Sequence, residues 1–132
     1  MNVEALKVLI VDDHMLMRSM VENYCLSMGF KTIKACSGGA QALNAMRTDD
    51  YDLVLMDWGM PDIPGIEVLK TLRADKKNDR TAIVMVTAES EDLRLIEALE
   101  AGATSYLVKP FSQEDFEKNV RNVLEWLKKQ RG

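Results

Sequence analysis

Short apolar runs alternate along this chain with stretches of helical periodicity, and this alternation constrains the fold more than any other feature. Two runs, Leu53–Met56 and Ala82–Val86, are apolar at every position, which is typical of strands covered on both faces of a sheet. A third, Lys31–Ala35, alternates polar and apolar residues and is expected near a sheet edge. The predicted strands are Lys7–Val11, Lys31–Ala35, Leu53–Met56, Ala82–Val86 and Tyr106–Val108.

A helix is predicted after each strand, from apolar residues at helical spacing. Gly29 closes the first helix as a C-cap residue would, and Ser112 with Asp115 resembles a capping box that opens the last one. Alternation of this kind forces parallel pairing, right-handed crossovers and helices on both faces. We therefore predict an α/β fold, a doubly wound (βα)5 parallel five-stranded sheet, as a single domain over residues 1–132.

The charge and composition of the 132 residues exclude several classes of function. The chain has 17 basic and 21 acidic residues and a formal net charge of -4, so it lacks the basic excess of a nucleic-acid binder. No apolar run approaches the ~18 residues of a membrane span, and residues 1–4 carry no basic leader. We therefore expect a cytoplasmic protein that binds neither nucleic acid nor membrane.

The cysteines and the histidine narrow the chemistry further. Cys25 and Cys36 lack metal-type spacing and are expected to be buried or semi-buried thiols in a reducing compartment. His14 is the only histidine, which excludes Ser-His catalysis and multi-histidine metal sites.

Polar residues follow four of the predicted strands where each strand ends. Asp12 and Asp13 follow the first, Asp57 the third, Thr87 the fourth and Lys109 the fifth. Each alone has an ordinary explanation as a helix cap, a turn residue or a surface charge. Because the carboxyl ends of parallel strands meet at one edge, where ligands bind in open sheets, we expect these side chains to form one site.

Carboxylates gathered in this way need a cation. Two carboxylates about 4 Å apart repel by about 4 kcal/mol at an effective dielectric constant of 20. A ligand set of oxygen atoms alone selects Mg²⁺, which is completed by waters and phosphate oxygens. A metal, a carboxylate nucleophile, a lysine and a hydroxyl are together the parts of a phosphoryl-transfer site.

At these residues the chain resembles the receiver domains of two-component response regulators. The resemblance covers the chain from Lys7 to the last helix and implies a flavodoxin-like fold with strand order 2-1-3-4-5. The matching motifs are Asp12-Asp13, Asp57, Met60-Pro61 through Gly65, Thr87-Ala88 and Lys109-Pro110-Phe111. Among receivers, the stand-alone chemotaxis regulators are the most similar, through Asp57-Trp58-x-Met60-Pro61, Lys70–Asp75 and Met85–Glu89.

The resemblance implies a phosphoacceptor and its cofactor. Asp57 would accept a phosphoryl group from a histidine kinase and become an aspartyl phosphate. Asp13 and Asp57 would ligate Mg²⁺ directly, Asp12 would help through a water molecule, and the backbone carbonyl of Gly59 would be a further ligand. Chemotaxis regulators usually carry Asn where this chain has Gly59, which offers no side chain to guide or block an attacking water.

The resemblance also implies a switch. Lys109 would pair with one phosphoryl oxygen and Thr87 would hydrogen-bond another, while Tyr106 would couple the site to a surface formed by the fourth helix, fifth strand and fifth helix. Leu95 is a candidate contact on that surface, because it lies off the apolar stripe of its helix, which is formed by Leu93, Ile96 and Leu99. The implied partner is an output protein, either a flagellar motor switch or a phosphotransfer protein, and the chain would be a monomer or a weak transient dimer.

Three alternatives stay open at this point. A phosphorelay intermediate would pass its phosphoryl group to a downstream histidine. A Mg²⁺-dependent phosphatase would use Asp57 as nucleophile, but such enzymes commonly place a second Asp where this chain has Gly59, so we expect a non-enzyme that assists its own phosphorylation and dephosphorylation. A binding module that no longer switches would keep the fold without the change of surface.

Overall fold

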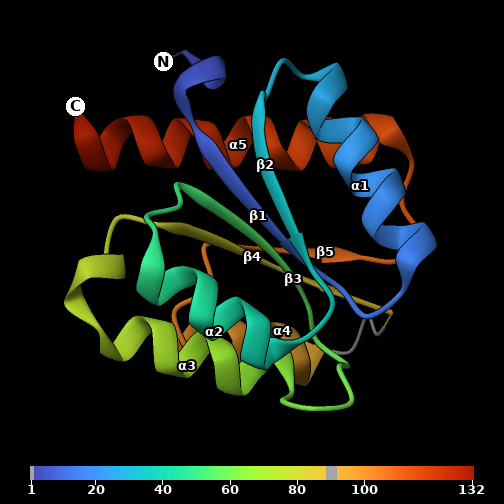
Figure 1. The fold of residues 1–132 in the computed structure, drawn as a ribbon, viewed down its shortest axis with the longest axis vertical. Coiled ribbons are helices and arrows are strands. Elements are labelled where there is room, and N and C mark those ends of the chain that lie inside the picture. The colour runs from blue at the N-terminus through green and yellow to red at the C-terminus, as the bar shows by residue number, and fades with distance from the viewer. Residues whose placement is uncertain (1, 89–91) are drawn as a thin grey trace.

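The computed structural model describes residues 2–88 and 92–132, which form a parallel five-stranded sheet between two layers of helices (Figure 1). The strand order is β2-β1-β3-β4-β5, as the resemblance implied. Glu89, the last residue of one motif, lies outside the described residues. The strands are β1 (Lys7–Val11), β2 (Thr32–Cys36), β3 (Leu53–Asp57), β4 (Ala82–Thr87) and β5 (Ser105–Val108).

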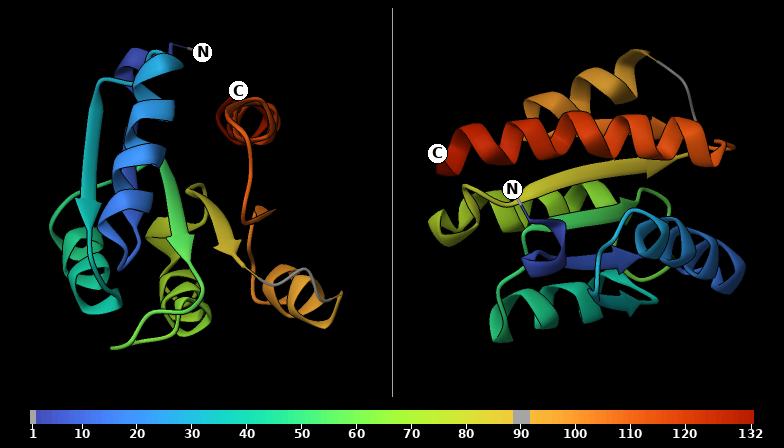
Figure 2. Two further views of the ribbon diagram at one scale, coloured as in Figure 1. Left: turned by 90° about the vertical axis from the view of Figure 1, so that its right-hand side faces the viewer. Right: turned by 90° about the horizontal axis from the view of Figure 1, so that it is seen from above.

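Five α-helices cover the sheet on both faces, as predicted. Figure 2 shows α1 and α5 on one face and α2, α3 and α4 on the other. None of the helices in the described part of the chain is long and apolar enough to cross a membrane. The helices are α1 (Met15–Ser27), α2 (Gly39–Thr48), α3 (Gly65–Ala74), α4 (Asp92–Glu100) and α5 (Gln113–Arg131), with short 3-10 turns η1 (Val3–Ala5) and η2 (Lys76–Asn78).

The central strands are buried because alternate side chains enter two different apolar layers. In β1, Leu9 and Val11 pack under α2 and α3, while Val8 and Ile10 pack under α1 and α5. The edge strand β2 is more exposed, as its alternating sequence predicted. A core on both faces fixes the register, since a slip of one residue would exchange the two layers.

Helix α4 differs from the prediction in the face that it buries. The apolar stripe points away from the sheet, with Leu93 78%, Ile96 49% and Leu99 50% exposed. Ala98 is fully buried instead, so a small residue brings the helix against the sheet. Leu95 is 36% exposed, and it therefore does not stand apart from the stripe as its sequence position suggested.

Two helices that start near the carboxyl edge, α5 and α2, are capped by side chains. Ser112 accepts a hydrogen bond from the Asp115 backbone N–H at 3.0 Å, which confirms the predicted N-cap of α5. Helix α2 starts at Gly39, and its N-cap residue, Gly38, has no side chain to cap it. The carboxylate of Asp62, from the loop after β3, accepts from Gly39 and Ala40 at 3.1 and 3.0 Å. This carboxylate therefore ties the loop that follows Asp57 to the start of α2.

Candidate functional site

The carboxyl ends of β1, β3, β4 and β5 open on one hollow of about 190 Å³, as the strand topology predicted. Asp57 is the last residue of β3 and Thr87 the last of β4, and both are buried. Lys109 follows β5, and its backbone N–H donates to the Thr87 carbonyl at 2.7 Å. The hollow is lined by His14, Asp57, Gly59, Thr87, Ala88, Arg94 and Lys109.

Lys109 joins two carboxylates from different strands. Its Nζ lies 3.0 Å from Asp12 Oδ2 and 3.2 Å from Asp57 Oδ1. All three side chains are largely buried, with exposed fractions of 14%, 5% and 6%. Asp13 lies beside these groups, so carboxylates outnumber the ammonium group in this cluster.

Burial and neighbouring charges shift the pKa values of the groups in the hollow. Burial raises the pKa of Asp57, the charge of Asp12 raises it further, and Lys109 only partly offsets this. Burial alone would lower the pKa of Lys109, but its hydrogen bond to Asp12 and the charges of Asp57 and Asp12 raise it. Lys109 therefore stays charged at neutral pH, while ionised Asp57 destabilises the metal-free fold.

A pH-dependent gain in stability should follow from replacing Asp57 by Asn. The native pKa of Asp57 is raised above its unfolded value, so the native state holds the proton more tightly and loses stability as the pH rises through that interval. In metal-free buffer, Asp57→Asn should therefore unfold at higher urea concentration than wild type at pH 7. The difference should shrink toward pH 4, and urea titrations at both pH values measure it.

Asp62→Asn is a control for which we expect the opposite change in stability. Backbone hydrogen bonds from Ala40, Gly39 and Ile63 lower the pKa of Asp62, so its ionised form stabilises the fold above the unfolded pKa. Asp62→Asn should unfold at lower urea concentration at pH 7, with the deficit disappearing as the pH falls. If the urea concentration of unfolding changed equally and in the same direction in both variants, this electrostatic account would be contradicted.

The acidic group has the donor set for a hard divalent cation. Ligand atoms of Asp12, Asp13, His14 and Asp57 all lie within 4.8 Å of one another, and two ligands on opposite sides of one Mg²⁺ ion are about 4 Å apart. Asp13 Oδ1 is buried, and apart from the His14 ring nitrogen 3.2 Å away it has no hydrogen-bond partner within the described chain. A buried carboxylate oxygen with so few partners is costly, and a cation would satisfy it. The residues therefore fit the predicted metal.

The backbone and neighbouring side chains orient Asp12 and leave Asp13 available. Asp12 Oδ1 accepts from the His14 backbone N–H at 2.9 Å, and Arg18 donates to the Asp12 carbonyl at 2.8 Å. Asp12, and not Asp13, therefore accepts a hydrogen bond from the backbone N–H of His14, the N-cap residue of α1. The ordinary explanation of Asp13 as a helix cap does not hold.

Two residues of the hollow were not singled out from the sequence. His14 places Nδ1 3.3 Å from Asp12 Oδ1 and 3.2 Å from Asp13 Oδ1, and its position directly after Asp13 was the signal for it. Arg94 reaches the hollow from α4 and lies 4.9 Å from the ring of Trp58. Nothing in the local sequence marked Arg94, because its placement depends on how α4 packs.

Of the residues predicted for the switch and the output surface, Thr87 lines the hollow, whereas Tyr106 and Leu95 lie outside its lining. Tyr106 is half-buried in β5 and packs against the core under α3 and α4. Asn119 of α5 donates to Ser105 Oγ at 3.0 Å and to the Tyr106 carbonyl at 3.3 Å. Leu95 is exposed on α4. Strand β5 therefore belongs to the surface of α4, β5 and α5, and Lys109 of the hollow is the residue that directly follows this strand.

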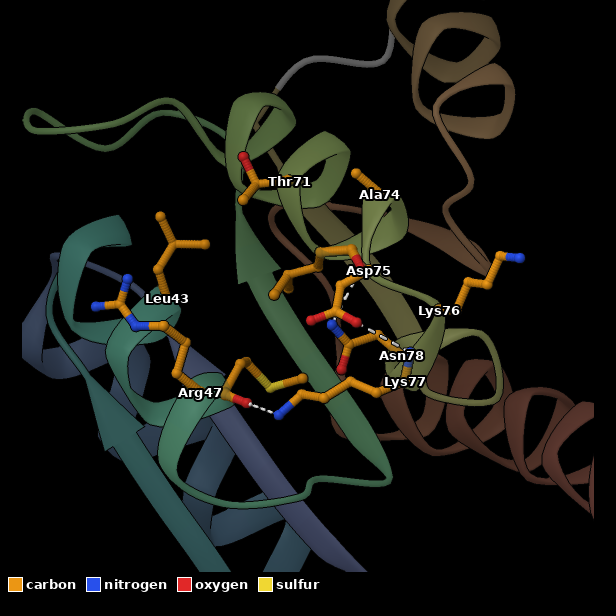
Figure 3. Close-up of a pocket in the computed structure, with 10 residues that line it drawn as sticks. Leu43, Arg47, Thr71, Ala74, Asp75, Lys76, Lys77 and Asn78 are labelled. Atoms are coloured by element: carbon orange, nitrogen blue, oxygen red, sulfur yellow. Dashed lines mark hydrogen bonds between the residues drawn. The ribbon is translucent and has the colours of Figure 1, made fainter.

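A second and larger hollow, of about 470 Å³, lies between α2 and α3 (Figure 3). Lys77 reaches across it and donates to the Met46 carbonyl, while Asp75 accepts from the Lys77 backbone N–H at 3.1 Å. Lys76 and Arg47 point away from its centre (Figure 3). Its polar groups bind one another or face outward, so size alone does not make it the functional site.

Comparison with known proteins identifies the family. Residues 8–121 match the family described as "Response regulator receiver domain". Chemotaxis protein CheY-3 of Vibrio cholerae serotype O1 is 37% identical over 122 residues, which cover 92% of this chain and 94% of that protein. The chain belongs to the response regulator receiver domain family, and among its members it is CheY-like. CheY of Pseudomonas aeruginosa is 34% identical over 120 residues, covering 91% and 97% of the two chains.

Solved structures agree with this assignment. Chemotaxis response regulator CheY4 of Vibrio cholerae superposes with a TM-score of 0.84 at 32% identity, covering 89% of this chain and 98% of that one. A CheY-like receiver domain protein from Methanospirillum hungatei gives a TM-score of 0.85 at 25% identity, covering 96% and 99%. The predicted fold and the predicted family are therefore both confirmed.

Proposed function

We propose that this chain is a Mg²⁺-dependent phosphoacceptor that signals by changing a protein-binding surface. The observation that carries the proposal is the placement of Lys109 Nζ between Asp12 Oδ2 and Asp57 Oδ1, at 3.0 and 3.2 Å, inside a hollow that also contains Thr87. A carboxylate poised beside a buried cation is suited to attack an incoming phosphorus atom, and the same cation offsets the charge of the transferring group.

The reaction proposed is transfer from a phosphohistidine of a kinase. A carboxylate oxygen of Asp57 forms the new O–P bond, and the imidazole nitrogen leaves with the electron pair of the broken N–P bond and then takes up a proton. Lys109 and Thr87 would hold phosphoryl oxygens. When bound through Asp13, Asp57 and the Gly59 carbonyl, with Asp12 assisting through water, Mg²⁺ would neutralise charge on the phosphoryl group.

Phosphorylation would change the surface of α4, β5 and α5. The phosphoryl group brings about 1.5 to 2 negative charges and strong acceptor oxygens to a site beside Thr87. Movement of Thr87 toward it would open space that Tyr106 could occupy. The exposed apolar residues of α4, among them Leu95, border this surface and supply area for a protein partner.

The names of the relatives favour chemotaxis as the pathway. Two of them are called chemotaxis proteins, so we propose a chemotaxis histidine kinase as the phosphodonor and a flagellar motor switch protein as one output. A phosphorelay role would instead require transfer to a second histidine. Incubating the phosphorylated protein with histidine phosphotransfer proteins distinguishes these roles, because only a relay intermediate should label them productively.

The phosphoacceptor proposal is tested by mass. With Mg²⁺ and acetyl phosphate, the wild-type protein should gain one phosphoryl group, and Asp57→Asn should gain none. Asp52→Asn, on the opposite edge of the sheet, is the matched control and should be labelled like wild type. Labelling of the Asp57 variant, or continued turnover of a phosphomonoester by wild type, would overturn the proposal.

A further inference from the structure

His14 gives the acidic site a ligand that the sequence argument did not include. That argument treated the donors as oxygen atoms alone, whereas the structure places the only imidazole of the chain among the carboxylates. Its Nδ1 lies 3.2 Å from Asp13 Oδ1 and 3.3 Å from Asp12 Oδ1. One nitrogen and three carboxylates therefore converge at the mouth of the hollow.

Contacts of Nδ1 with Asp12 and Asp13 hold the imidazole at this position, and helix capping does not account for it. His14 occupies the N-cap of α1, yet its side chain makes no capping hydrogen bond. The side chain is 69% exposed, so burial does not hold it in place. It also faces Asp13 Oδ1, a buried oxygen that has no other hydrogen-bond contact within the described chain. The ring nitrogen and this oxygen are therefore neighbours, and a single cation could take the place of the hydrogen atom between them.

We propose that His14 makes this site bind a borderline divalent metal, of the Zn²⁺ or Ni²⁺ class, in competition with Mg²⁺, with Asp13 as the shared ligand. Zn²⁺ and Ni²⁺ accept imidazole nitrogen together with carboxylate oxygen, whereas Mg²⁺ prefers oxygen ligands and retains its waters. The inference rests on the proposed function in one respect, because it takes the Mg²⁺ site as the place of competition.

The test compares metal affinities of wild type and His14→Asn by calorimetry. Asn is a favoured N-cap residue, so the start of α1 should be preserved. We expect Zn²⁺ and Ni²⁺ to bind the variant at least about tenfold more weakly, the lower bound for losing even an outer partner of a metal site. Mg²⁺ affinity should be unchanged. Asp13→Asn is the second variant and should weaken the binding of both classes of metal.

Imidazole resonances supply a readout that a structural role would not move. Because His14 is the only histidine, its ring nitrogens give a single pair of signals in a long-range ¹H–¹⁵N spectrum. Zn²⁺ should shift the Nδ1 signal strongly, and Mg²⁺ should not. Cys25 is a weak competitor for Zn²⁺, since burial raises the pKa of its thiol to about 12.

The outcomes separate this inference from the proposed function. Equal Zn²⁺ affinity in wild type and His14→Asn, or a parallel loss for Zn²⁺ and Mg²⁺ in that variant, would overturn the role of His14. Absence of Mg²⁺ binding to wild type would instead overturn the proposed cofactor. In that case, a Zn²⁺ affinity that depends on His14 would still establish the imidazole as a ligand.

Discussion

Replacing Lys109 by Met should lower the rate of phosphorylation by acetyl phosphate about 10²- to 10³-fold, the usual cost of losing one donor that stabilises charge in a transition state. Lys109 lies within 3.2 Å of carboxylates from β1 and β3, and Met fills similar space without charge. Stopped-flow measurement of Trp58 fluorescence follows the reaction, because this buried indole adjoins Asp57.

The same substitution should destabilise the protein in metal-free buffer. Loss of one partner leaves Asp12 and Asp57 buried beside each other without a cation, which costs about 3 kcal/mol in the free energy of unfolding. Mg²⁺ should restore part of this stability if it binds these carboxylates. Urea titrations with and without Mg²⁺ measure both effects.

Lys70→Met is the matched control for both measurements. Lys70 is 50% exposed and within the described residues pairs with Glu67 at 3.7 Å, so its replacement should change stability by less than about 0.5 kcal/mol. Its phosphorylation rate should equal that of wild type. A Lys109→Met protein that is phosphorylated at the wild-type rate would show that the ammonium group takes no part in the reaction.

The features predicted from the sequence are those that strand topology fixes. Parallel strands with helical crossovers must bring their carboxyl ends to one edge, so Asp12, Asp57, Thr87 and Lys109 could be placed together without coordinates. Their roles in phosphoryl transfer stay predictions. Their proximity follows from the strand order, because β1, β3, β4 and β5 are consecutive in the sheet, and the long side chain of Lys109 reaches from the end of β5 to Asp12 and Asp57.

The features that the sequence did not reveal depend on how helices lie against the sheet. Periodicity identified an apolar face on α4 but could not tell that Ala98 packs inward while Leu93 faces solvent. A small residue permits close approach, and nothing local distinguishes this from burial of the larger side chains. Arg94 reached the hollow for the same reason, since its position follows from the rotation of α4 about its axis.

Loop contacts were missed because they join residues far apart in the chain. Asp62 caps a helix whose first residues lie 22 and 23 positions earlier, and no local pattern encodes such a bond. The contacts of His14 are with its chain neighbours Asp12 and Asp13, and they were missed for a different reason, because the direction of this side chain depends on the extended backbone at the N-cap of α1. Sequence reasoning could therefore find the acidic site but not its full set of donors.

Gly65→Ala should produce the second large effect, through the backbone of the phosphoacceptor. A Cβ atom at Gly65 would lie 2.1 Å from the Asp57 carbonyl oxygen and 3.0 Å from Met85 Cε. The Gly65 N–H also donates to the Trp58 carbonyl at 2.7 Å, so α3 starts in direct contact with the end of β3. The backbone must move to admit the methyl group, which should cost about 3 kcal/mol of unfolding free energy.

Displacement of Asp57 should slow phosphorylation as well, by up to about 10²-fold for a shift near 1 Å. Gly59→Ala is the matched control in the same loop, because a Cβ there would meet no atom within 4 Å. It should change stability by less than about 0.5 kcal/mol and leave the Gly59 carbonyl in place. Urea titration and acetyl phosphate kinetics on both variants decide the matter: equal behaviour of the two would show that close contact between α3 and β3 does not position the phosphoacceptor.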